Sequence, residues 1–179
     1  MSALPDAPEL LDAAAAVPWV RALHDAVDTR SAAVSASHGP RLTCRLGCSG
    51  CCQDDLTVYE VEALRIEAEF PDLLAKGTPG PSGACAFLDT SGGCRIYAAR
   101  PYVCRTQGLP LRWLEEGEDW EFVERRDICP LNAEGPALET LSDDHCWHVG
   151  PVEDRLAYAQ EALDGGAMRR VGLRGLFTS

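Results

Sequence analysis

Apolar residues recur at helical spacing over residues 8–37, the first long pattern along the chain. One helix face would carry the set Leu10, Leu11, Ala14, Val17, Val20, Leu23 and Val27. Pro18 suits the first turn of a second helical piece, because the N–H that proline lacks has no partner in a first turn. Gly39 and Pro40 end the pattern, so it predicts a helical scaffold over residues 1–40.

Two later segments also predict helices. Thr57 and Glu60 have the spacing of a capping box, which would open a helix that runs to about residue 70 and stops at Pro71. A final helix is predicted over about residues 152–163, where a pair of glycines closes the apolar pattern.

Short apolar segments between these helices predict two small hairpins. Residues 85–88 and 94–97 flank a glycine-rich turn, and residues 109–114 and 120–124 flank a turn-like stretch at 115–119. The elements together predict an α+β, mainly helical fold in which helices bracket a loop-rich, cysteine-lined centre with short hairpins.

Length and charge narrow the class of protein. The 179 residues fit one domain. A net charge of −12 argues against a nucleic-acid partner, because phosphates would be repelled. Arg169, Arg170 and Arg174 are an exception, and we interpret this tail as a solvated helix end or a segment that docks a partner.

The N-terminus lacks the pattern of a signal peptide, and no apolar run is long enough for a membrane span, so we expect a cytoplasmic protein without a membrane partner.

Nine cysteines are the main chemical feature of the chain. Four lie within residues 44–52, and the spacing Cys44-x3-Cys48-x2-Cys51 lets three sulfur atoms converge on one centre. Cys52 follows directly, and adjacent side chains point in different directions. Cys51 and Cys52 would therefore serve different metals, or one of them bridges a multinuclear centre, or Cys52 is a buried bystander.

A metal centre is the best use of these thiols, since a reducing compartment disfavours disulfides. The predicted ligands are Cys44, Cys48, Cys51, Cys52, Cys85, Cys94, Cys104 and Cys129. Zinc, an iron–sulfur cluster and copper(I) all accept thiolates, so spacing does not choose the metal. We therefore expect three parts in one compact domain: a scaffold over 1–40, a metal-binding core over 41–131, and a helix and tail over 132–179 that pack on the core.

Other residues near the cysteines could also take part in the site. Cys146, between His145 and His148, is either an outlying ligand or a buried thiol beside a packed tryptophan. His24 and His38 are expected to be surface or capping residues. The nearby arginines would neutralise thiolate charge, and they are Arg95, Arg100 and Arg105.

The combined cysteine pattern resembles a known family. After the quartet come Cys85-x-Phe-Leu and Cys94-x-Ile-Tyr-x-x-Arg-Pro-x-x-Cys-Arg, and over about residues 42–130 this is similar to the YkgJ-type cysteine-cluster family. That resemblance implies a zinc- or iron-chelating domain. Flagellin lysine-N-methylases carry a similar motif, which implies an oxygen-sensitive iron–sulfur centre there. Ala86 stands where the family commonly has Pro after the cysteine, and Gln107-Gly108 stands where it often has Phe-Pro. Neither departure removes a ligand.

We therefore expect a metal-binding protein whose cysteines chelate iron, an iron–sulfur cluster, or zinc. An enzyme that uses the centre for redox or methyl-transfer chemistry is the first alternative, with Tyr97, Arg100 and Arg105 as pocket residues. The chain shows no pattern that assigns a catalytic residue, so a binding role is favoured over an enzymatic one. A structural protein held together by disulfides is the second alternative. The trio Cys44, Cys48 and Cys51 also has the spacing of radical S-adenosylmethionine enzymes, but the chain lacks the strand–helix repeats of that barrel.

Overall fold

The computed structural model describes residues 3–45, 47–117 and 119–178. Over these residues the fold is mixed, with 46% of the chain helical and 13% in strands, so the predicted predominance of helix is confirmed. The described helices are α1 (Ala13–His38), α2 (Glu60–Glu69), α3 (Pro71–Lys76), α4 (Tyr102–Arg105) and α5 (Gly150–Asp164). The described strands are β1 (Thr57–Tyr59), β2 (Leu111–Glu116), β3 (Phe122–Asp127), β4 (Trp147–His148) and β5 (Arg170–Gly172).

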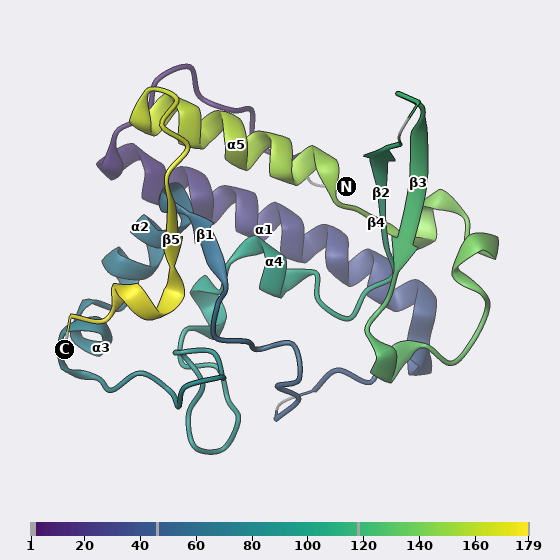
Figure 1. The fold of residues 1–179 in the computed structure, drawn as a ribbon, viewed down its shortest axis with the longest axis horizontal. Helices are drawn as coiled ribbons and strands as arrows, with labels where there is room; N and C mark the ends of the chain where they lie inside the picture. The colour runs from purple at the N-terminus through teal and green to yellow at the C-terminus, as the bar shows by residue number, and fades with distance from the viewer. Residues whose placement is uncertain (1–2, 46, 118, 179) are drawn as a thin grey trace.

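The long helix α1 supports the rest of the molecule, and α5 lies alongside it (Figure 1). Asp12 caps its start, because the Asp12 carboxylate accepts the Ala15 N–H at 2.8 Å. Pro18 lies inside this helix rather than at the start of a second piece, so the predicted division is wrong. Leu23 and Val27 are fully buried, and this packing outweighs the single hydrogen bond that Pro18 removes.

Two hydrophobic cores lie on different sides of α2. The first joins α1 to α5 and includes Val20, Leu23 and Val61. The second contains Ile66 of α2 and Phe87, and Cys85 is buried among its members. Cys52 and Cys94 pack against this second core, so part of the cysteine-rich region is built into apolar packing.

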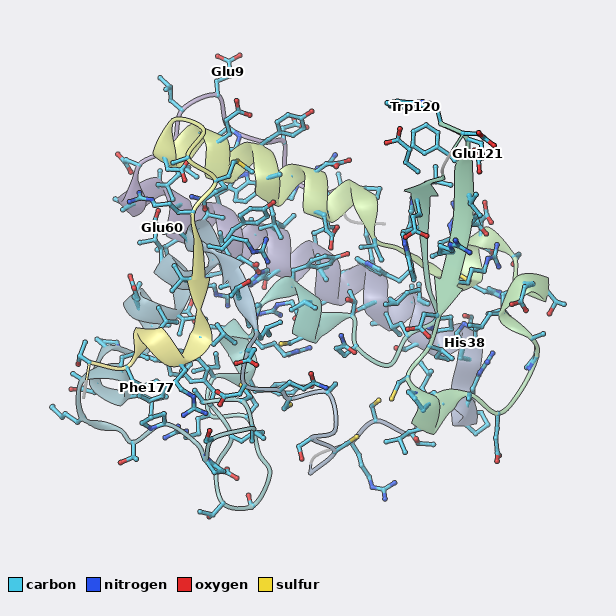
Figure 2. All side chains as sticks on the ribbon, viewed as in Figure 1. Glu9, His38, Glu60, Trp120, Glu121 and Phe177 are labelled. Carbon is cyan, nitrogen blue, oxygen red and sulfur yellow. The ribbon has the colours of Figure 1, made fainter. Side chains whose placement is uncertain are left out.

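Small sheets complete the fold. β2 and β3 form the predicted second hairpin, and β4 pairs parallel to β2 on its other edge. The hairpin projects from the molecule with Trp120 and Glu121 at its tip (Figures 1 and 2). Glu118, in the predicted turn, lies outside the described residues. The first predicted hairpin is only a turn closed by one bridge, between Leu88 and Cys94.

The predicted capping box is wrong. Thr57 belongs to β1, which pairs antiparallel with β5, and helix α2 begins at Glu60 after Tyr59. The partner strand comes from the far end of the chain, so local spacing could not reveal it. Pro71 does end α2 as predicted, but it also begins α3, where its missing N–H costs nothing.

The C-terminal tail is part of the fold, which corrects its interpretation as a solvated end or a docking segment. Its 3-10 helix Leu173–Leu176 buries Leu173, and Phe177 packs on Phe87 in the second core. The guanidinium of Arg174 pairs with the Asp54 carboxylate and also donates to the carbonyl oxygens of Gly80, Pro81 and Ala84. The tail therefore ties together two of the loops around the cysteines.

Candidate metal centre

Most of the predicted ligands line one cavity of about 500 Å³. It is bordered by seven of the eight cysteines, namely Cys44, Cys48, Cys51, Cys52, Cys85, Cys94 and Cys104. Three stretches far apart in the sequence supply them: the loop before β1, the turn around residue 89, and helix α4. Cys129 is not among the lining residues, but Asn132, which donates its N–H to the Cys129 carbonyl, also donates its side-chain amide to Cys44 Sγ, so the segment of Cys129 reaches the site.

Backbone hydrogen bonds bring the loop and the turn together. The Cys85 N–H donates to the Cys52 carbonyl at 2.9 Å, which joins the end of the quartet to the start of the turn. The Leu88 N–H donates to the Cys85 carbonyl at 3.0 Å, and the bridge between Leu88 and Cys94 returns the chain. Cys52, Cys85 and Cys94 are therefore placed by main-chain contacts, whatever their sulfur atoms bind.

Helix α4 presents Cys104 to the cavity and is held from behind by buried polar groups. The Glu62 carboxylate accepts the Tyr102 N–H at 2.7 Å and contacts His24 Nε2 at 2.9 Å. Arg65 contacts His24 Nδ1 at 2.8 Å. His24 is fully buried, so its expected place on the surface is wrong. Burial lowers the pKa of His24, which favours the neutral ring that accepts from Arg65 and donates to Glu62.

Asn132 holds the opposite side of the site, a role that no motif in the sequence indicates. Its buried side-chain amide donates to Cys44 Sγ at 3.5 Å and to the Gly108 carbonyl at 2.8 Å. Its side-chain oxygen accepts the Thr43 N–H at 2.8 Å, and its own N–H donates to the Cys129 carbonyl at 2.8 Å. Asn132 thus connects the two segments, through its side chain to Cys44 and through its backbone to Cys129.

Gly108 gives Cys44 its space. The backbone of Gly108 has φ +91°, and a Cβ placed there would lie 2.5 Å from Cys44 Sγ. A side chain at this position would therefore both strain the backbone and displace the sulfur. Glycine at residue 108 therefore leaves room for the Cys44 thiol.

Desolvation dominates the acidity of the thiols. Burial and the neighbouring cysteines raise the pKa of Cys52 to about 12 and that of Cys104 to about 12. Burial also raises the pKa of Cys44 and Cys94, although the Asn132 hydrogen bond lowers that of Cys44 in part. These thiols are protonated at neutral pH without a metal, so a metal ion that binds them must displace protons.

The sulfur atoms are neighbours rather than a finished coordination shell. Among the described residues, no group of three Cys, His, Asp or Glu side chains is arranged closely enough to hold a metal ion. All nine cysteines are free thiols. Four-coordinate thiolate sites need sulfur at roughly 2.3 Å from zinc, so loops must close further around an ion. The donor type and its clustering fit a soft metal.

The three arginines near the cysteines have other hydrogen-bond partners. Arg105 donates to Asp28 at 2.5 Å and to the Ala98 carbonyl, and Arg95 donates to the Ala86 carbonyl at 2.6 Å. Arg100 stacks on Tyr97 at 4.0 Å at the edge of the cavity. Their expected role in neutralising thiolates stays a prediction, whereas the Asn132 amide does donate to a cavity sulfur, that of Cys44.

Cys146 lies apart from the cavity. It is buried next to Trp147, and the Arg126 guanidinium lies 3.8 Å from its sulfur. It does not line the cavity of the other cysteines, and Arg126 and Arg112 are the cations that lower the pKa of its thiol. His145 uses its backbone carbonyl to accept from His38, at 2.6 Å, and His148 is exposed on β4. The structure therefore favours a buried thiol over an outlying ligand.

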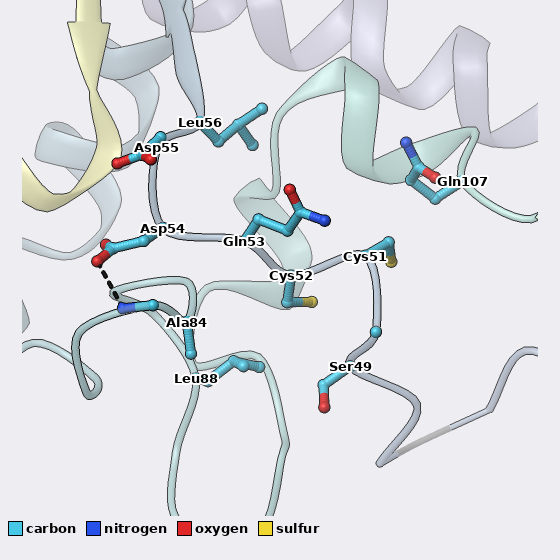
Figure 3. Close-up of a pocket in the computed structure, with 12 residues that line it drawn as sticks. Ser49, Cys51, Cys52, Gln53, Asp54, Asp55, Leu56, Ala84, Leu88 and Gln107 are labelled. Carbon is cyan, nitrogen blue, oxygen red and sulfur yellow. Dashed lines mark hydrogen bonds between the residues drawn. The ribbon is translucent and has the colours of Figure 1, made fainter.

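A second cavity of about 760 Å³ adjoins the first and shares Cys51, Cys52 and Gln107 with it. Figure 3 shows Cys51 and Cys52 side by side on its wall. Asp54 turns to the opposite wall, where its carboxylate accepts the Gly83 N–H at 2.9 Å. The quartet loop therefore separates two hollows, and both reach the adjacent pair of cysteines.

No helix within the described ranges is long and apolar enough to cross a membrane.

Residues 43–130 match the model of the CxxCxxCC family, which is described as "Putative zinc- or iron-chelating domain". The resemblance of the sequence to a cysteine-cluster family is confirmed by this match, and metal binding in general is supported by it. Searches of curated proteins and of solved structures found no match to the chain.

Proposed function

Because residues 43–130 carry a chelating domain of the CxxCxxCC type, we propose that the protein binds transition-metal ions through cysteine thiolates. The ligands are drawn from Cys44, Cys48, Cys51, Cys52, Cys85, Cys94, Cys104 and Cys129. The observation that carries this proposal is the single cavity lined by seven of these thiols from three separate parts of the chain.

Iron, held in an iron–sulfur centre, is the metal we favour over zinc. The cavity is lined by cysteines without any histidine, and iron–sulfur clusters are held by cysteine thiolates. Its volume of about 500 Å³ also leaves more space than a single four-coordinate ion needs. Asn132 donates a hydrogen bond to Cys44 Sγ. Hydrogen bonds to sulfur atoms help to set the reduction potential of an iron–sulfur cluster.

The role that follows is a carrier, sensor or structural metal module in the cytoplasm. An enzyme that uses the centre is a second candidate, because the cavity extends past the sulfur atoms to Tyr97 and Arg100. Tyr97 is 63% exposed and Arg100 stacks on it, so this edge of the cavity is open to a small molecule. Binding of S-adenosylmethionine to the metal-loaded protein would support the methyl-transfer version, and its absence would remove that version.

The test of the main proposal is direct metal analysis after anaerobic purification, together with an absorption spectrum. We expect iron, acid-labile sulfide and visible absorption. A colourless protein that carries stoichiometric zinc would keep the proposal of thiolate metal binding and end the preference for iron. A folded protein with reduced thiols and no transition metal after incubation with Fe²⁺ plus sulfide, or with Zn²⁺, would refute the proposal altogether.

A further inference from the structure

We propose that the eight cysteines form two neighbouring four-thiolate sites, an inner and an outer one. The inner site consists of Cys52, Cys85, Cys94 and Cys104, and the outer site of Cys44, Cys48, Cys51 and Cys129. This proposal rests on the proposed function and deepens it, because it says which cysteines share a metal centre.

The inner four are joined by packing and by the main chain. Cys85 is buried in the second core, where Cys52 and Cys94 pack against it, and the Cys85 N–H donates to the Cys52 carbonyl. Cys104, on α4, lines the same cavity as these three cysteines, and their proximity adds to the burial that raises the pKa of its thiol. The four therefore surround one volume on the core side of the cavity.

The outer four meet around Asn132. Cys44 lies in the quartet loop with Cys48 and Cys51, and Cys48, Cys129 and Cys51 are the cysteines whose proximity raises the pKa of its thiol. Asn132 holds Cys44 through its side-chain amide and Cys129 through its N–H. The Cys48 N–H donates to the Arg45 carbonyl at 2.9 Å, and this turn curls the quartet loop back toward Cys44. Cys44 and Cys51 are exposed, so this group lies at the solvent side.

Cys51 and Cys52 mark the division between the groups. Consecutive side chains cannot easily converge on one small ion. Cys52 packs against the second core and Cys51 is exposed, so we assign Cys52 to the inner group and Cys51 to the outer one. Their thiols still influence one another, so the two centres are adjacent. Four thiolates are also the full complement of a structural zinc site or a four-cysteine cluster, and eight cysteines supply two such sets.

Accessibility then gives the two sites different roles. Cys85 is only 9% exposed and belongs to the second core, so metal in the inner site supports the fold. The outer site lies in loops at the surface and holds two exposed cysteines. We infer that the outer metal is the exchangeable one, which reaches chelators or partners, and that the inner metal is retained.

The test uses the full-length protein, loaded in parallel with Zn²⁺ and with Fe²⁺ plus sulfide, with metal per chain measured by mass spectrometry. Cys44→Ser and Cys129→Ser report on the outer site, and Cys146→Ser is the matched control for loss of a cysteine outside both groups. We expect the outer variants to keep their fold by circular dichroism and about half of the metal, and Cys146→Ser to keep all of it. Cys104→Ser should lose the inner metal and unfold at lower temperature.

A chelator added to the wild type gives a second readout that needs no variant. We expect metal release in two phases of similar size, and only the slow phase in Cys44→Ser. Outer variants that lose all metal while they stay folded, or that lose none, would overturn the division into two sites. Wild-type protein without metal would instead refute the proposed function itself, so the two failures are distinguishable.

Discussion

Replacement of Gly108 by alanine is the sharpest test of the contact between the protein scaffold and a sulfur ligand. The new Cβ would lie 2.5 Å from Cys44 Sγ and 3.2 Å from Asn132 Nδ2. Ordinary contact requires about 3.5 Å, so the sulfur must move by roughly 1 Å. Metal–ligand distances tolerate only about 0.2 Å of error, so this displacement removes Cys44 from a coordination shell or opens the shell.

Gly166→Ala is the matched control, because Gly166 has the same φ of +91° and no atom within 4 Å of an added Cβ. It lies beyond α5, in the turn that precedes β5, and its N–H donates to Asp164. The left-handed backbone costs both variants about 1–2 kcal/mol. At about 2–4 °C per kcal/mol for a chain of this size, we expect both melting temperatures to fall by about 2–8 °C from strain alone.

The two variants should differ in metal binding. For Gly108→Ala we expect a loss of about 10–100-fold in affinity at the outer site, which is the range for changes that misplace a metal ligand. Gly166→Ala should bind metal as the wild type does. Competition with a chromophoric chelator under anaerobic conditions measures both. Equal metal affinity in the two variants would show that Cys44 Sγ is not a ligand at the position seen in the structure.

The other predictions concern ligands, pH and the tail. Cys48→Ser and Cys51→Ser should lower metal content, as the other outer-site variants do, whereas Cys146→Ser should keep all of it. Full metal in Cys51→Ser by mass spectrometry would contradict the ligand assignment. His24 has a pKa below its usual 6.5 in the folded protein, so as the pH falls the unfolded chain binds a proton at this residue before the folded chain does. The free energy of unfolding is therefore highest above pH 6.5 and decreases as the pH falls toward the pKa of His24 in the folded protein. His24→Gln should weaken this slope in thermal melts between pH 7.5 and 5, and an unchanged slope would be evidence against it. Arg174→Ala removes the ion pair with Asp54 and three hydrogen bonds to carbonyl oxygens, so it should lower the free energy of unfolding in urea by about 1–2 kcal/mol. The control Arg125→Ala, which removes an exposed ion pair, should lower it by less than about 1 kcal/mol, and equal losses would refute the role of the tail in holding the loops together.

Local patterns predicted the elements whose stability is local. Helix α5 ends at Gly165, whose φ of +69° is the left-handed cap that the glycine pair predicted. The β2–β3 hairpin also follows from two nearby apolar segments. The capping box at Thr57 failed because β5, more than a hundred residues later, pairs with this segment and makes it a strand. Such pairing depends on where the tail packs, and no local spacing contains that information.

The sequence by itself determined the chemistry of this protein: nine thiols, eight of them in a pattern that matches a chelating family, on an acidic and mainly helical chain. Only the tertiary structure decided which thiols are neighbours, that Asn132 and Gly108 shape the space around Cys44, and that His24 is a buried support of α4. The physical reason is that donor type is a property of each residue, whereas proximity and burial arise when segments far apart in the chain exclude water together.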